Sequence, residues 1–168
     1  MILFGVRTPL AVDYEIAAER QGMQFRVGVS LGGQPRTLMT ARIVELTDLT
    51  PDDMGPALPC AWAPLRRAEL ARIAQDLGFG LAETLCDPHA ILPPGLRVDD
   101  AGFIGAGVVI GGGSFLGKGV LVNRSASLGH HTVLNDWVSI GPGAILSGNI
   151  RIGARSMIGA GAVLHTAF

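Results

Sequence analysis

Residues 98–164 read VDDAGFIGAGVVIGGGSFLGKGVLVNRSASLGHHTVLNDWVSIGPGAILSGNIRIGARSMIGAGAVL, and a six-residue repeat runs through the whole stretch. An aliphatic residue recurs at every sixth position, and glycine follows it in seven of the twelve repeats. From residue 102 on, a small or β-branched residue stands two places before each aliphatic one. The aliphatic positions are Val98, Ile104, Ile110, Leu116, Val122, Leu128, Leu134, Ile140, Leu146, Ile152, Ile158 and Leu164.

This period of six fits neither an α-helix, with 3.6 residues per turn, nor a strand with simple alternation. It fits a prism in which each six-residue unit forms one flat side and one corner, so that three units make one coil. The aliphatic residue then fills the axis, and its small neighbours let the chain turn the corner. The pattern therefore predicts a parallel β-helix of about four coils.

The composition of the chain excludes several classes of protein. Of its 168 residues, 48% are hydrophobic, and 13 basic residues nearly balance 14 acidic ones. We therefore expect no nucleic-acid partner, because no basic block is available to neutralise phosphates. No run of about 18 apolar residues is free of Gly, Pro or charge, so we expect no membrane-spanning helix. The first residues also lack the features of a signal peptide, and we expect a cytoplasmic protein.

The chain changes character near residues 90–96, where Pro93, Pro94 and Gly95 indicate a turn or linker. Before this point strand-like and helix-like segments alternate, which predicts a small parallel sheet flanked by helices. The expected strands are residues 2–6, 25–29, 41–46 and 57–63, and the expected helices are residues 10–21 and 64–77.

Each expected helix has one apolar stripe that predicts its buried face. In the first helix this stripe holds Val12, Ile16 and Ala17, and in the second it holds Leu70, Ile73 and Leu77. The second helix also carries Arg66 and Arg67, which we interpret as charges on a solvated face; the alternative is that they contact a phosphate.

Residues 98–167 resemble the hexapeptide-repeat acyltransferases, whose fold is a left-handed parallel β-helix. The segment NRSASLGHHTVLNDWVSIGPGAILSG, residues 123–148, is similar more narrowly to the branch of sialic acid O-acetyltransferases and bacillosamine-type N-acetyltransferases. That branch has a small Rossmann-like domain in front of the β-helix. The resemblance therefore implies a Rossmann-like α/β domain over residues 1–86 and a left-handed β-helix over residues 87–168.

His130 is the candidate catalytic residue. Because a coil comprises three six-residue units, His130 stacks between Gly112 and Gly148, with open space beside its ring. An imidazole there can accept a proton near neutral pH, and a backbone N–H can stabilise a developing oxyanion. The alternative is an exposed corner histidine without a catalytic role. The resemblance implies that His130 is the general base and that the backbone of Gly148 contacts the acetyl carbonyl.

The resemblance also implies supporting residues. It implies that Asn123 helps to shape the pocket and that Gly141 and Gly143 belong to the site that binds acetyl-CoA. Two positions depart from the family pattern, because His131 replaces an acidic residue and Ser139 replaces a second histidine.

A neutral His131 can at best be a hydrogen-bond partner of His130, whereas a charged one would lower the pKa of its neighbour. Asp136 is a further candidate for support, although its position one face around the prism favours a solvated turn residue. We expect no metal site, since zinc would need about three converging imidazoles. His130 and His131 are adjacent and expected on opposite sides of the wall, and His165 falls in a different column.

The front domain gives a weaker indication of the acceptor. Relatives that bind nucleotide-sugars have a glycine-rich loop after the first strand, which holds phosphate. Residues 5–10 here read GVRTPL, with one glycine and one proline, and they leave Arg7 as the candidate substrate-binding residue. A UDP-sugar is therefore not supported, and another sugar nucleotide or an unrelated acceptor stays open.

We expect an acetyl-CoA-dependent acyltransferase that acetylates an amine or hydroxyl of a sugar by direct transfer. Relatives are homotrimers, with the cofactor between adjacent prisms. The alternative is a trimeric scaffold or ligand-binding protein with a degenerate site. The changed residues at His131 and Ser139 favour this alternative. So does an early end of the chain, because relatives continue for roughly two more coils.

Overall fold

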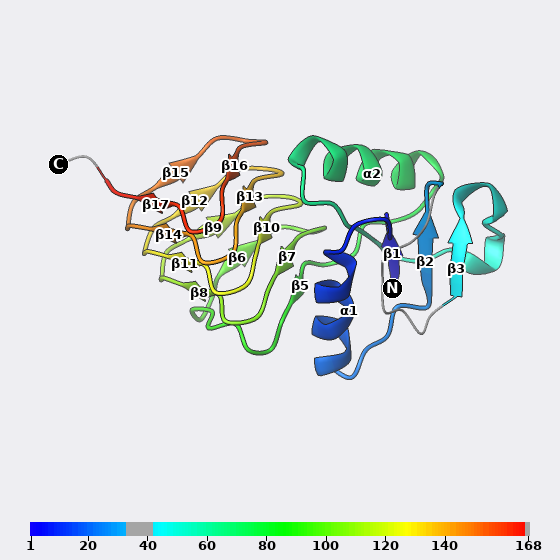
Figure 1. The fold of residues 1–168 in the computed structure, drawn as a ribbon, viewed down its shortest axis with the longest axis horizontal. Helices are drawn as coiled ribbons and strands as arrows, with labels where there is room; N and C mark the ends of the chain where they lie inside the picture. The colour runs from blue at the N-terminus through cyan, green and yellow to red at the C-terminus, as the bar shows by residue number, and fades with distance from the viewer. Residues whose placement is uncertain (33–41, 167–168) are drawn as a thin grey trace.

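The computed structural model describes residues 1–32 and 42–166, which form an α/β unit and a prism that pack side by side (Figure 1). The α/β unit is built on a parallel sheet with the strand order β3-β2-β1-β4. Its elements are β1 (Ile2–Phe4), α1 (Ala11–Arg20), β2 (Val27–Ser30), β3 (Arg42–Glu45), β4 (Ala57–Pro59) and α2 (Pro64–Asp76), with short 3-10 turns at Leu46–Asp48 and Pro51–Asp53. The expected strands and helices are all present, most of them shorter than predicted. Ala41 lies outside the described residues.

The two helices of the α/β unit cover opposite faces of its sheet. Helix α1 packs on the face that carries Leu3 and Leu58, and α2 packs on the face that carries Ile2 and Phe4. Because the chain moves from β1 to β2 on one side and later to β4 on the other, the strand order changes direction beside β1.

The predicted buried faces of the helices are partly wrong. Helix α1 buries Tyr14 and three alanines, while Val12 and Ile16 are only half-buried, since α1 lies between the sheet and the prism and small residues allow both to approach. In α2 the buried stripe includes Leu70 but also Arg67, and Leu77 at the C-cap is 48% exposed.

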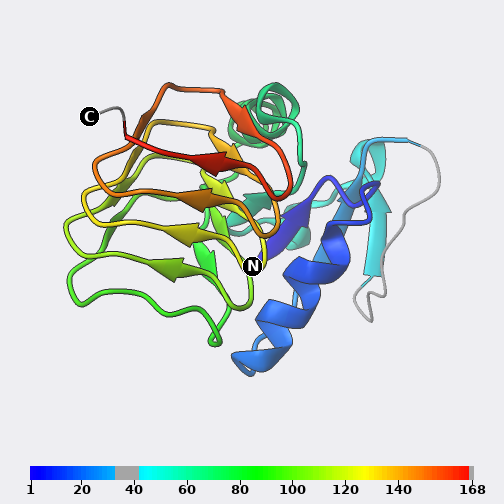
Figure 2. The same cartoon turned by 60° about the vertical axis from the view of Figure 1, so that its left-hand side comes forward.

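The prism has three walls, each a parallel sheet whose members come from successive coils (Figure 2). Wall 1 contains β5 (Leu85–Cys86), β7 (Phe103–Ile104), β10 (Leu121–Val122), β13 (Ser139–Ile140) and β16 (Met157–Ile158). Wall 2 contains β8 (Val109–Ile110), β11 (Ser127–Leu128), β14 (Ile145–Leu146) and β17 (Val163–Leu164). Wall 3 contains β6 (Arg97–Val98), β9 (Phe115–Leu116), β12 (Val133–Leu134) and β15 (Arg151–Ile152).

The strand register confirms the predicted coil of three six-residue units. Leu121 pairs with Ser139 in wall 1, and Ser127 pairs with Ile145 in wall 2, each pair three units apart in the chain. Every residue of the prism therefore has the residue three units before or after it as its neighbour along the axis.

The predicted aliphatic column forms the axis. Its members from Ile104 to Ile152 are at most 7% exposed, whereas Val98 at one end is 37% exposed. Burying each such side chain contributes roughly 1.5–3 kcal/mol. The small residues two places earlier also point inward, and Val108, Val120 and Ala144 are buried in the same cluster.

The corners have a periodicity of their own. Every sixth residue from Gly95 to Gly161 has a φ between +55° and +74°, a left-handed conformation that glycine adopts without strain. Half of these positions hold other residues: Ala101, Ser125, His131, Trp137, Asn149 and Arg155. The corner therefore imposes one backbone shape whatever side chain it carries.

The α/β unit packs against wall 1 of the prism and leaves β16 at its end partly exposed. The ring of Tyr14 in α1 stacks on that of Phe103 in β7, with centroids 4.1 Å apart and an interplanar angle of 14°. Neither described helix is long and apolar enough to cross a membrane.

Candidate active site

His130 lies at the corner that follows wall 2, and its ring packs against the backbone of Gly148 in the next coil. A Cβ atom on Gly148 would lie only 2.6 Å from both Cε1 and Nε2 of His130. The His130 carbonyl also accepts a hydrogen bond of 2.8 Å from the Asn149 N–H. The predicted juxtaposition is therefore present, and it requires that residue 148 has no side chain. We call residues 111–113, 129–131 and 147–149 the histidine corner.

Two glycines at the start of this corner allow the coils to approach. A Cβ on Gly111 would lie 2.5 Å from the His130 nitrogen, and a Cβ on Gly129 would lie 2.4 Å from the Gly148 nitrogen. Both contacts are to backbone, which cannot move aside without shifting a whole coil. The glycine after the aliphatic residue, visible in the sequence repeat, thus fixes the place of His130 and Gly148.

The space on the other side of His130 is open. A Cβ built on Gly112, one coil earlier, would meet no atom within 4 Å. His130 itself is exposed in the single chain. The corner therefore leaves room for a reacting group beside the imidazole.

His130 and His131 point toward each other, and the expectation that they lie on opposite sides of the wall is wrong. Their Nδ1 atoms are 3.0 Å apart, and the two rings are inclined by 84°. The left-handed backbone of His131, with φ +55°, turns its side chain back toward its neighbour. One Nδ1 must donate and the other accept, so the proton positions of the two imidazoles are coupled.

Asp136 and Ser139 are not brought to His130 within the chain. Asp136 lies at the corner after wall 3, where its Oδ1 accepts a hydrogen bond of 3.0 Å from the Lys118 N–H. Ser139 lies in wall 1, fully buried, and its Oγ donates to the Trp62 carbonyl at 2.8 Å.

Asn123, Gly141 and Gly143 lie at the corner that follows wall 1, which we call the asparagine corner (residues 105–107, 123–125 and 141–143). Asn123 is 7% exposed, and its Oδ1 accepts a hydrogen bond of 2.7 Å from the Arg124 N–H. Since wall 2 runs from this corner to the histidine corner, the two groups lie at opposite edges of wall 2. One chain alone does not unite them.

The outer surface of wall 2, between these two corners, carries four exposed apolar side chains in one column. Ile91, Val109, Ile145 and Val163 are 66%, 40%, 49% and 55% exposed, respectively. The half-buried Ser127 stands between Val109 and Ile145 in this column.

Arg7 lines a cleft of about 150 Å³ at the carboxyl ends of β1, β2 and β4. Its Nη1 donates to the Leu31 carbonyl at 3.4 Å. The lining residues are Gly5, Arg7, Thr8, Leu31, Cys60, Ala61, Arg66 and Leu70. Open parallel sheets bind ligands at this edge, where the strand order changes direction. Arg66, for which the sequence favoured a solvated face over a phosphate contact, is a second cation of the cleft, because the fold brings α2 to this edge.

The expectation of a solvated Arg67 is wrong. Arg67 is fully buried, and burial lowers its pKa. Its guanidinium donates to the Gly119 carbonyl at 2.8 Å and to Ser139 Oγ at 2.9 Å. Carbonyl oxygens from several turns converge on it, and this convergence has no signature in the local sequence.

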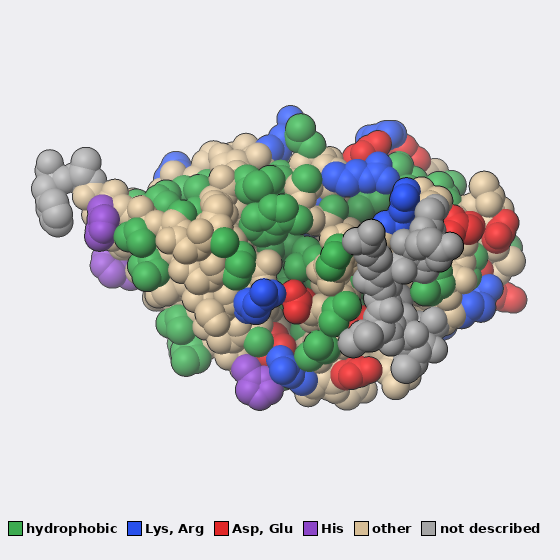
Figure 3. All heavy atoms as spheres, viewed as in Figure 1, with side chains coloured by type: hydrophobic (Ala, Val, Ile, Leu, Met, Phe, Trp, Pro, Cys, Tyr) green, Lys and Arg blue, Asp and Glu red, His purple; other side chains and the backbone are tan. Residues whose placement is uncertain are grey.

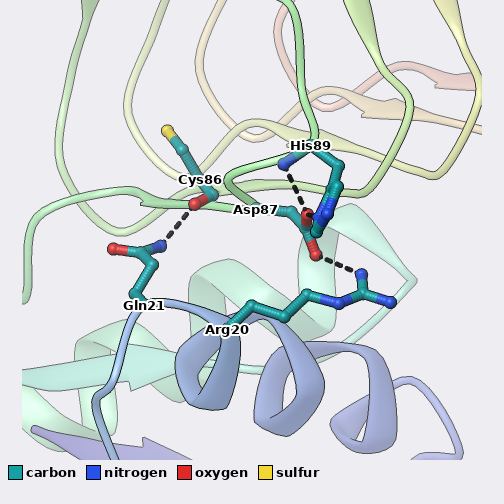
Figure 4. Close-up of polar contacts among 5 residues, drawn as sticks. All are labelled: Arg20, Gln21, Cys86, Asp87 and His89. Atoms are coloured by element: carbon teal, nitrogen blue, oxygen red, sulfur yellow. Dashed lines mark hydrogen bonds and ion pairs between the residues drawn. The ribbon is translucent and has the colours of Figure 1, made fainter.

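Asp87 ties α1 to the segment that enters the prism (Figure 4). Its carboxylate accepts hydrogen bonds from Arg20 Nη1 at 2.7 Å and from the His89 N–H at 2.8 Å. Gln21 donates to the Cys86 carbonyl beside it. Burial alone would raise the pKa of Asp87, but the hydrogen bonds from His89 and Arg20 hold it below its ordinary value.

On the face drawn in Figure 3, histidine side chains reach the surface at the end of the prism and near the junction. His89 contacts Asp87 at 3.1 Å, and His165 contacts Ser147 Oγ at 3.2 Å. Over the described ranges, no three His, Cys, Asp or Glu side chains are grouped so as to hold a metal ion.

Solved structures that resemble the chain include acetyltransferases, which confirms the expected resemblance to hexapeptide-repeat acyltransferases and the expected class of enzyme. One is the acetyltransferase domain of PglB from Neisseria gonorrhoeae FA1090, solved in complex with acetyl coenzyme A. It is 28% identical, with a TM-score of 0.81, and the alignment covers 96% of this chain and 80% of that one.

A second is GDP-perosamine N-acetyltransferase from Caulobacter crescentus, solved as a histidine-to-alanine mutant with CoA and GDP-perosamine. It is 22% identical with a TM-score of 0.78, and the alignment covers 96% of this chain and 86% of that one. At this identity the likeness concerns the fold. No family model matches the chain, and a comparison with curated proteins finds no relative.

Proposed function

We propose that the protein transfers the acetyl group of acetyl-CoA directly to an amine or hydroxyl of a nucleotide-linked sugar, with His130 as the general base. The observation that carries this proposal is the packing of the His130 ring on Gly148. The likeness to a PglB domain that binds acetyl coenzyme A supports it.

Acetyl-CoA supplies a thioester, whose carbonyl carbon is open to attack by an amine or hydroxyl. Among the described residues, none accepts a hydrogen bond from the Gly148 N–H. This N–H is therefore free to donate to the carbonyl oxygen as negative charge develops there, a contribution of about 3 kcal/mol for one such donor. The residues at the histidine corner are thus suited to hold the thioester of acetyl-CoA.

His131 determines which nitrogen of His130 acts as the base. If His130 Nδ1–H donates to His131 Nδ1, then His130 Nε2 carries a lone pair and can take the proton of the attacking group. The opposite arrangement would place a proton on Nε2 and block it. A neutral His131 thus replaces the acidic residue of the family as an acceptor, although without its negative charge.

The acceptor is proposed to bind through the cleft of the α/β unit. Arg7 and Arg66 both line this cleft, and two cations at the carboxyl edge of a parallel sheet suit a phosphate-bearing ligand. GDP-perosamine, the ligand of the Caulobacter enzyme, is of this chemical class.

We further propose a homotrimer of left-handed β-helices with about four coils each, preceded by a Rossmann-like domain over residues 1–86. The domain of residues 87–168 would associate through the apolar column of wall 2. Such an assembly would bring Asn123, Gly141 and Gly143 of one copy toward His130 of another. It would place acetyl-CoA between adjacent prisms.

Two measurements test the proposal. Calorimetry with acetyl-CoA should show binding below millimolar concentration. Release of free thiol should then depend on an added nucleotide-linked amino-sugar, with GDP-perosamine as the first of the panel. Absence of acetyl-CoA binding at millimolar concentration would contradict the enzymatic proposal.

That outcome would favour the second candidate, a non-catalytic scaffold or ligand-binding protein. One observation supports this candidate: Ser139, at a family histidine position, is buried against Arg67 and Trp62 and faces no open space.

A further inference from the structure

Among the side chains that the structure describes, Arg67 makes the most hydrogen bonds at the contact between the α/β unit and the prism. It comes from α2, is fully buried, and donates to acceptors on both sides of this contact. The α/β acceptors are the carbonyls of Ala61 (2.7 Å) and Trp62 (3.1 Å). The prism acceptors are the carbonyls of Gly119 (2.8 Å), Trp137 (3.2 Å) and Val138 (3.0 Å) and the hydroxyl of Ser139 (2.9 Å).

All six of these acceptors are uncharged. A buried cation held only by neutral groups gains no ion-pair energy in return for its desolvation, so net stability is a poor explanation for it. What the guanidinium does supply is direction, because its N–H groups form a rigid planar fork. The fork therefore restricts where the carbonyls from two consecutive coils and from the loop before α2 can lie relative to one another.

One of the two α/β acceptors belongs to the wall of the cleft. Ala61 lines the cleft itself, and so do Arg66, which precedes Arg67, and Leu70, one turn later. The fork of Arg67 therefore ties one wall of the proposed acceptor cleft to two turns of the prism.

We propose that Arg67 is a positioning residue, which holds the acceptor cleft in a fixed orientation relative to the acetyl-transfer site of the prism. This inference rests on the proposed function. Arg67 itself touches no substrate, since it is fully buried. Its loss should let the cleft shift while each binding site keeps its own residues.

The test is Arg67→Lys, which keeps the charge and loses the fork, with Arg72→Lys as the matched control. Arg72 lies on the same helix, exposed, in an i,i+4 pair with Asp76. With GDP-perosamine or the best acceptor of the panel, kcat of Arg67→Lys should fall at least tenfold, since misplacement by about 1 Å costs up to a hundredfold. The Kd values of acetyl-CoA and of the acceptor, measured by calorimetry, should stay within twofold.

A folded Arg67→Lys variant with unchanged kcat would overturn the inference. So would an equal loss of acetyl-CoA affinity, because that would indicate general damage to the prism. If Arg67→Lys does not fold, Ser139→Ala decides, since it removes only one acceptor. Ser139→Ala should lower kcat two- to fivefold and leave the Kd values of acetyl-CoA and of the acceptor unchanged. An unchanged kcat in this variant would contradict the positioning role of Arg67.

Hydrogen–deuterium exchange separates this inference from the proposed function. If the wild-type protein transfers no acetyl group, the proposed function fails. Arg67→Lys should still speed exchange in residues 61–70 and leave residues 140–152 unchanged. Equal exchange in wild type and variant would refute the tie between cleft and prism.

Discussion

The prism and the α/β unit place their functional residues by different means. In the prism, position 130 stands beside position 148 because neighbouring coils are offset by three six-residue units. This neighbourhood follows directly from the repeat in the sequence. In the α/β unit, Arg7 and Arg66 meet at a sheet edge although they lie far apart in the chain, and no period relates them. A site in a periodic fold can be predicted from the sequence, whereas a site formed by tertiary contacts between distant residues cannot.

Glycine has a different task in each region. In the prism, Gly111 and Gly129 are needed because the next coil passes within 2.5 Å of where a Cβ would be. In the α/β unit, Gly22 and Gly78 follow helix ends at positive φ, and Gly80 would tolerate a Cβ with no atom within 4 Å. The prism is therefore sensitive to added volume where one coil stacks on the next, as at Gly111 and Gly129, whereas Gly80 of the α/β unit has room for a side chain.

The largest effect is expected at the imidazole that the repeat places on Gly148. His130→Gln should lower kcat by roughly 10²–10⁴-fold, as for the loss of a general base. The far-UV spectrum and the oligomeric state should not change, because His130 is exposed. Thiol release under saturating acetyl-CoA is the measurement, and full activity in this variant would end the case for His130 as the base.

Next comes a test of coil packing. Gly129→Ala should destabilise the prism by about 3 kcal/mol, since the new methyl group would meet backbone of the adjacent coil. Gly80→Ala is the matched control in the α/β unit and should change the free energy of unfolding by less than about 0.5 kcal/mol. Urea denaturation measures the free energy of unfolding of both variants. Equal losses would show that Gly129 in the prism tolerates a methyl group as well as Gly80 in the α/β unit does.

Gly148→Ala sharpens the same contrast within the site. The methyl group would displace only the imidazole of His130, so stability should change little while kcat falls roughly ten- to a hundredfold. Gly112→Ala, one coil earlier and open on this side, is the control and should keep most of its activity. If Gly148→Ala lowers the free energy of unfolding and leaves kcat unchanged, the methyl group displaces something other than the His130 ring.

The junction between the two regions should depend on pH. Because the pKa of Asp87 is lowered in the folded protein, its contribution to stability is complete above the unfolded value of about 3.9. That contribution is lost as pH falls through this value toward the folded pKa. Asp87→Asn should therefore lower stability by about 1–2 kcal/mol at pH 7, and the difference should shrink below pH 4.

Thermal unfolding from pH 7 down to pH 3 measures this, with the exposed Asp76→Asn as the control. A constant difference between wild type and Asp87→Asn across the whole range would contradict an ionised Asp87.

The smallest effect concerns the left-handed corners. Ser125, at φ +58°, should accept glycine with a gain of about 0.5 kcal/mol, because the strain of a Cβ in this conformation is removed. Gly22→Ala in the α/β unit, at φ +70°, should lose about 1 kcal/mol for the reverse reason. A fall in Tm of Ser125→Gly would mean that the serine side chain has a role of its own.

The repeat in the sequence was sufficient for the axis residues, the coil length and the contact of His130 with Gly148. It was insufficient for the orientation of His131, because its direction depends on a positive φ, and half of the positions with that φ are not glycine. The burial of Arg67 could not be predicted either, since its partners are mostly backbone carbonyls, which every residue has. From the sequence alone, an arginine is expected to be exposed to solvent. It can be buried only where the fold provides hydrogen-bond acceptors for its N–H groups.

The register of three units per coil also limits how such a chain can change its length. An insertion or deletion of three complete units adds or removes one whole turn of the solenoid and returns every later side chain to its own wall. A change that is not a whole number of units would turn axis residues outward, and one or two units would exchange one wall for another. Insertions of a few residues are therefore expected only as bulges at the corners, whereas the prism itself lengthens by complete turns.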